Sequence, residues 1–83
     1  MFNEKYTRKE LRSIYKDAKY NWSSDLGSLD LASNDNKIII ISKTKGDIKL
    51  YLKDGNQIKY DGVIIHSFNE FIKFYEALVN LIK

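Results

Sequence analysis

The chain has 83 residues, of which 43% are hydrophobic and 30% are charged, and its formal net charge is +3 at pH 7. This length suits one domain and the hydrophobic content is enough for one core, so a disordered, fibrous or low-complexity chain is excluded. Cysteine is absent, which excludes disulfides, thiolate metal sites and cysteine nucleophiles. We therefore expect a single domain over residues 1–83.

The sequence also gives expectations about the location of the protein and the kind of organism that encodes it. The first twenty residues are charged throughout and lack the apolar segment of a signal peptide. The longest apolar run, Ile38–Ile41, is far shorter than the ~20 residues of a membrane helix. A small secreted domain usually needs disulfides, so we expect a cytoplasmic protein with no membrane partner. The abundance of Lys, Ile, Asn and Tyr is typical of A/T-rich coding DNA and indicates a low-GC bacterium or its phage.

The first predicted element is an amphipathic helix at about 7–20. Thr7 and Glu10 have the spacing of a capping box, in which each side chain bonds the backbone N–H of the other. The apolar residues that follow recur on one helix face and are Leu11, Ile14, Tyr15 and Ala18. The opposite side is basic and carries Arg8, Arg12, Lys16 and Lys19.

Strands separated by turn residues are predicted next, and they form an antiparallel meander of four to five strands. Their expected bounds are about 28–32, 37–43, 47–53, 57–60 and 63–66. Pairing apolar with apolar residues requires a two-residue turn at Lys45-Gly46, a three-residue loop at 54–56 and a two-residue turn at Asp61-Gly62. One face of this sheet is then the predicted core face, with Ile39, Ile41, Ile48, Leu50, Leu52, Ile58, Tyr60, Val63 and Ile65.

The last predicted element is a helix at about 67–82, with Ser67 as N-cap and Glu70 completing a second capping box. Its apolar stripe covers about half of its circumference, which is more than one sheet face requires. The surplus residues are Phe74, Ala77 and Leu81. Unless the first helix covers them, they form an interface for a second copy of the chain or for another partner. The predicted fold class is α+β, with the C-terminal helix packed on the sheet.

Few side chains are suited to catalysis. His66 is the only histidine, and its neighbour Ser67 is better explained as a helix cap, because adjacent residues rarely point at one reacting atom. Carboxylates are scattered singly and the four glycines stand apart, so neither a metal site nor a phosphate-binding loop is predicted. We therefore expect a protein that is not an enzyme and uses no cofactor or metal.

Two basic surfaces are candidates for binding. The basic side of the first helix could bind phosphates or an acidic protein surface, although Glu10 and Asp17 dilute its charge and a merely solvated surface is the simpler interpretation. On the outer face of the sheet, Lys49, Lys53 and Lys59 surround Tyr51, an aromatic side chain that could stack on a base. The simpler interpretation is that the first helix packs on this face.

A third candidate is an exposed sheet edge. If the strand at 37–43 lies at an edge, it could add to the sheet of a partner.

These observations favour a small non-enzymatic protein that binds and occludes a larger protein or nucleoprotein. An inhibitor of a host or defence nuclease, similar in action to anti-CRISPR proteins, is one concrete form. The alternative is a nucleic-acid-binding module that uses the basic helix and the lysine and tyrosine side chains of the outer sheet face.

Overall fold

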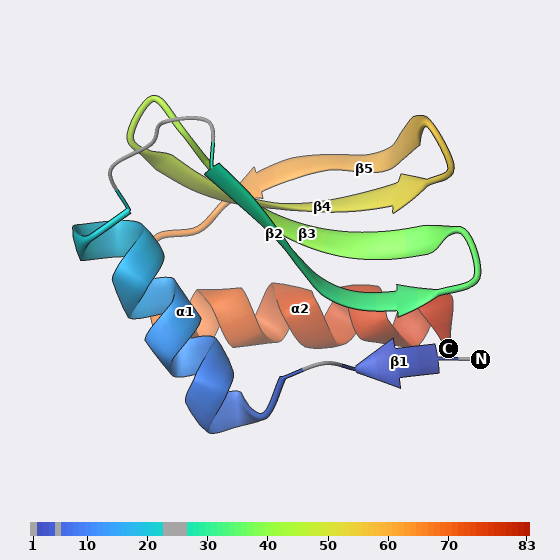
Figure 1. Ribbon diagram of the computed structural model, residues 1–83, viewed down its shortest axis with the longest axis horizontal. Coiled ribbons are helices and arrows are strands. Elements are labelled where there is room, and N and C mark those ends of the chain that lie inside the picture. The colour runs from blue at the N-terminus through green and yellow to red at the C-terminus, as the bar shows by residue number, and fades with distance from the viewer. Residues whose placement is uncertain (1, 5, 23–26) are drawn as a thin grey trace.

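The computed structural model describes residues 2–4, 6–22 and 27–83, and it has the expected α+β architecture (Figure 1). Its elements are β1 (Phe2–Glu4), α1 (Arg8–Tyr20), β2 (Gly27–Asn34), β3 (Lys37–Thr44), β4 (Asp47–Asp54), β5 (Gln57–Ile64) and α2 (Phe68–Ile82). The strands form one antiparallel sheet in the order β1-β2-β3-β4-β5. The meander is therefore confirmed, and β1 is an additional strand that the sequence pattern did not reveal.

Both helices begin at the predicted caps. The Thr7 Oγ1 accepts the backbone N–H of Glu10 at 3.2 Å, and the Glu10 carboxylate accepts the backbone N–H of Thr7 at 3.1 Å. These two bonds complete the capping box. At α2, the Ser67 Oγ accepts the backbone N–H of Glu70 at 3.2 Å, which is the first of the two capping-box bonds. The role of Ser67 as a helix cap is thus confirmed.

The central hairpin has the predicted register. Ile41 lies opposite Leu50 and Ile39 opposite Leu52, and the turn consists of Lys45 and Gly46. Both turn residues have positive φ, at 52° and 85°. Two consecutive residues of this conformation match the right-handed twist of the flanking strands, and glycine adopts it without strain.

The prediction for the chain after β4 is wrong in two respects. Asp54 pairs with Gln57, so the turn has two residues, Gly55 and Asn56, rather than three. Residues 57–64 then form the single strand β5, where the sequence pattern predicted two strands and a turn at 61–62. Two irregularities in the β4–β5 register keep apolar residues opposite one another, because they place Leu52 beside Tyr60 and Leu50 beside Val63. Irregularities within the strands, rather than the expected loops, thus keep apolar residues paired with apolar residues.

Gly62 lies within β5 because Tyr51 needs the space beside it. A Cβ atom added to Gly62 would lie 2.7 Å from the Tyr51 ring and 3.0 Å from the Lys49 Cβ. This glycine therefore permits a close approach between two strands, whereas the sequence pattern assigned it to a turn.

The strand β2 is longer than predicted and irregular. It spans Gly27–Asn34, and its register with β3 shifts between Asp30 and Ala32. As a result Leu31 and Ala32, which are adjacent in sequence, are both fully buried. At the end of this strand the Asn34 side-chain amide donates to the Ile82 carbonyl oxygen, which fixes the C-terminal end of α2 to the sheet.

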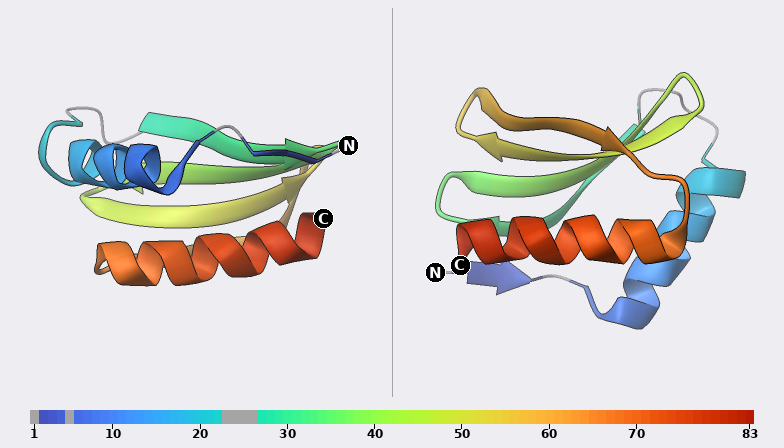
Figure 2. Two further views of the ribbon diagram at one scale, coloured as in Figure 1. Left: turned by 90° about the horizontal axis from the view of Figure 1, so that it is seen from below. Right: turned by 180° about the vertical axis from the view of Figure 1, so that it is seen from behind.

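The core lies between the sheet and α2. Figure 2 shows α2 as a layer beneath the sheet, with α1 at one end of the sheet beside the N-terminal half of α2. The helix α2 contacts β2, β3 and β4. Its stripe and the inner sheet face form one cluster, which includes the fully buried residues Ile39, Ile41, Leu50, Phe71, Tyr75 and Ile82.

The sequence left open which sheet face the first helix covers. The structure places α1 away from the outer face, because it packs on α2 and joins the same core. The Tyr15 ring lies edge-on to Phe68 and Phe71, with centroids 6.1 and 5.8 Å apart. The link after α1 is attached to the sheet, since the Trp22 carbonyl accepts a 2.6 Å hydrogen bond from the Lys43 ammonium. One aromatic cluster thus joins α1 to α2. Neither helix of the described residues lies over the outer sheet face (Figure 2).

Candidate binding surface

The basic side of α1 does not form one free surface. The Arg8 guanidinium lies 3.7 Å from the Glu76 carboxylate on α2, and the Arg12 guanidinium lies 4.1 Å from the centroid of the Phe68 ring. Both arginines therefore contribute to the contact between the helices. Lys16 and Lys19 are exposed, and the Lys19 ammonium lies 5.4 Å from the centroid of the Tyr20 ring. All four basic residues are thus exposed, and the two arginines also contact α2.

Three members of the predicted lysine and tyrosine group lie on the outer face of the sheet. In β4, buried residues alternate with half-buried ones. The buried set faces α2, so Lys49, Tyr51 and Lys53 share the outer face, and all three are half-buried. Lys59 is exposed on β5. An aromatic side chain between two lysines is therefore present on a sheet face with no helix over it.

The strand β3 lies in the middle of the sheet, so the expectation that 37–43 could be an edge is wrong. The long edge strand is β5, which pairs with β4 alone among the described strands. The other edge, β1, has three residues. A central position for the four isoleucines follows from their burial on one face and half-burial on the other.

Hydrophobic side chains are exposed along β5. Ile58, Tyr60, Val63 and Ile64 have exposed fractions of 54%, 48%, 38% and 42%. Tyr60 and Val63 lie on the predicted face of the sheet, opposite Leu52 and Leu50, but they are exposed there. The predicted face of Ile58 is wrong, because it lies opposite Lys53 on the outer face. The only other large hydrophobic side chains exposed in the described part of the chain are Tyr20 and Leu81, so exposure of this kind is concentrated on one strand.

An apolar groove lies between this strand and α2. It has a volume of about 180 Å³ and is lined by Leu50, Tyr60, Val63, Phe74, Ala77 and Leu78. Two of the three surplus residues predicted on the C-terminal helix, Phe74 and Ala77, are thus in the groove. The third, Leu81, is 52% exposed one turn further along α2. The helix α1 lies beside the N-terminal end of α2 (Figure 2).

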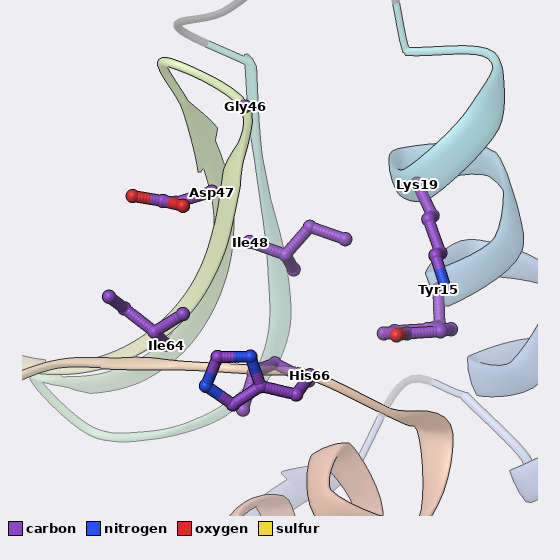
Figure 3. Close-up of a pocket in the computed structure, with 8 residues that line it drawn as sticks. Tyr15, Lys19, Gly46, Asp47, Ile48, Ile64 and His66 are labelled. Carbon is purple, nitrogen blue, oxygen red and sulfur yellow. The ribbon is translucent and has the colours of Figure 1, made fainter.

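A second cavity, of about 220 Å³, lies between α1, the β3–β4 turn and the link from β5 to α2 (Figure 3). Figure 3 shows Tyr15 and Lys19 on one side of this space and His66 below it, while the Asp47 carboxylate points away from Lys19. His66 and Lys19 are exposed. Within the described residues, no group of three histidine, aspartate or glutamate side chains is placed to hold a metal ion.

Comparisons with known proteins found no matching family model, no matching curated protein and no matching solved structure. In the described part of the chain, neither helix is long and apolar enough to cross a membrane.

The exposed set on β5 was missed because the sequence pattern predicts which face of a strand is apolar, and not whether anything covers that face. One signal could have found it. A helix with its side chains is about 10 Å wide, whereas neighbouring strands are about 4.8 Å apart, so one helix covers two or three strands. A meander with one long helix beneath it therefore leaves an edge strand bare.

Proposed function

We propose that this protein binds a larger protein or nucleoprotein and occludes part of its surface without catalysing a reaction. The observation that carries this proposal is the exposed edge strand β5. Its Tyr60 and Val63 line the apolar groove, and its Ile58 and Ile64 are exposed on the other face of the sheet. Exposed apolar surface beside a groove commonly marks a protein interaction site. In the form we favour, the partner is a host or defence nuclease and the protein inhibits it in the bacterial cytoplasm, as anti-CRISPR proteins do.

Nucleic-acid binding is the second candidate, supported by Tyr51 between Lys49 and Lys53 on the uncovered sheet face. The geometry of α1 weakens this candidate. Arg8 and Arg12 contact Glu76 and Phe68, so two of the four cations that would neutralise phosphates already have partners within the protein.

The two candidates are separated by affinity capture from a low-GC bacterial lysate, with and without added nuclease. The wild type is compared with Val63→Lys, which places a charge in the groove, and with Tyr20→Lys. Tyr20 is the matched control because it is 72% exposed and lies on α1, away from the groove. We expect a protein that the wild type and Tyr20→Lys capture after nuclease treatment and that Val63→Lys does not.

Circular dichroism first establishes that both variants are folded. Capture that disappears on nuclease treatment contradicts the proposed function and favours nucleic-acid binding by the outer sheet face. Capture that Val63→Lys leaves unchanged contradicts the groove beside β5 as the binding surface.

A further inference from the structure

In the described sheet, the backbone of β5 is unpaired along one edge. An apolar groove lies on one side of this strand, and on the other side Ile58 and Ile64 lie next to Lys53 and Lys49 of β4. We infer that the partner protein adds an extended segment to this edge as a sixth strand, and that apolar and acidic residues alternate along that segment. The inference rests on the proposed function and specifies the chemistry of the partner.

The backbone of β5 provides the first argument. In the described sheet β5 has eight residues and a neighbour on one side only. Alternate N–H and C=O groups of such a strand point away from the sheet and can bond a further strand. The opposite edge strand, β1, has three residues and offers fewer of these groups. Strand addition is therefore expected at β5.

The groove provides the apolar half of the pattern. Val63 and Tyr60 are partly exposed on the side of β5 that faces α2, where Phe74, Ala77 and Leu78 complete the groove. In an added strand, every second side chain points to this side of the sheet. Apolar side chains at these positions would fill the groove and cover Val63 and Tyr60.

The outer face provides the acidic half. Lys53 lies opposite Ile58 and Lys49 opposite Ile64 in the β4–β5 register. An added strand would be two strand spacings, about 10 Å, from β4, a distance that lysine and glutamate side chains span together. Ile58 and Ile64 are thus the side chains of β5 itself on this face, and the stems of Lys53 and Lys49 can lie along them while the ammonium groups stay in water. These two positive charges favour an acidic segment over a basic or neutral one.

The test uses a seven-residue synthetic peptide in which Glu and Val alternate, with both ends blocked. Three controls have the same length: Lys in place of Glu, a sequence with all the Val residues grouped together, and the alternating peptide with N-methyl groups on one backbone edge. Binding is followed by the amide NMR shifts of the protein and by hydrogen exchange. The variants are Lys53→Glu and the matched control Lys45→Glu. Lys45 is exposed in the β3–β4 turn, at the other end of β4 from Lys53.

We expect the alternating acidic peptide to shift the β5 amides and to slow exchange of those not bonded to β4. The three control peptides should bind more weakly, because each lacks one part of the recognition. Lys53→Glu should weaken binding by about twofold to fivefold, the effect expected from an exposed ion pair, and Lys45→Glu should not.

Three outcomes overturn the inference. The first is equal binding of the N-methylated peptide, which would show that no strand is added. The second is preference for the basic peptide. The third is concentration-dependent protection of β5 without peptide, which would assign the edge to a second copy of this chain. If any of these occurs while Val63→Lys still abolishes capture of a protein, strand addition fails and the proposed function stands.

Discussion

Glu10 shows at the scale of one residue how a local signal becomes a measurable property. The hydrogen bonds from the Thr7 backbone N–H and from the Thr7 hydroxyl stabilise the Glu10 carboxylate and lower its pKa below the ordinary value of 4.5. A lowered pKa stabilises the folded state above the unfolded pKa, and this contribution is lost as the pH falls through the folded pKa.

We therefore expect Glu10→Gln to be less stable than the wild type at pH 7 and the difference to shrink below about pH 4.5. Urea unfolding of both proteins at pH 7 and pH 3 measures the change. A difference that stays constant over this range would show that the charge of Glu10 does not stabilise α1.

Gly62 is a second residue with a specific packing role. Gly62→Ala should destabilise the protein by about 1–3 kcal/mol, the usual cost of overpacking, because the new methyl group meets Tyr51 and the Lys49 Cβ. In a Tyr51→Ala background the cost should be smaller, since the ring is gone. Urea midpoints of the four proteins give this coupling, and equal costs in both backgrounds would contradict the proposed contact.

At the scale of elements, the contact between α1 and α2 contains two arginines in different settings. Arg12 lies over the Phe68 ring at 4.1 Å, whereas the ion pair of Arg8 with Glu76 joins side chains that are 67% and 64% exposed. We expect Arg12→Ala to cost about 0.5–1 kcal/mol and Arg8→Ala to cost less, because exposed ion pairs contribute little. Chemical unfolding of the two variants provides the comparison, and a larger effect at Arg8 would reverse this assignment.

The elements also show which parts of the fold the sequence predicts. Thr7, Ser67 and the Lys45-Gly46 turn act on their own neighbours in the chain, so the helix starts and the central hairpin were predicted correctly. The placement of α1 depends on Phe68 and Phe71, which are more than 50 residues away in sequence from Tyr15. Bulges in β2 and β5 likewise depend on the residues that pack beneath them. The hydrophobic periodicity of a strand does not indicate which residues these are.

For the candidate site, the sequence predicted which helix residues are surplus to the core, but it did not predict which part of the sheet is left uncovered. Phe74 and Ala77 were identified as surplus on their helix, and they line the groove. Val63 and Tyr60 were assigned to the core face from the pattern of apolar residues. This pattern is the same whether or not a helix covers that face. Tyr60 and Val63 are exposed because α2 is narrower than the sheet above it.

At the scale of the whole molecule, one core between the sheet and α2 carries the stability. Ile41, Leu50 and Phe71 are 0%, 1% and 0% exposed, so replacing each with Ala should cost about 2–5 kcal/mol. Ile58→Ala, at a side chain 54% exposed, is the control and should cost much less. Urea midpoints for the four variants test this, and four similar values would contradict the division between buried and exposed strand faces.

The strand order has a consequence for how the chain reaches this structure. The strands β2 to β5 are neighbours in the sheet and in the chain, so each of their pairings closes a short loop at little entropic cost. The exception is β1, since Phe2 pairs with Asn34 across the whole of α1. Contacts between distant residues form slowly, so we expect the meander to form early and β1 to join late. Removing residues 1–4 should then accelerate unfolding in stopped-flow measurements and leave the refolding rate almost unchanged.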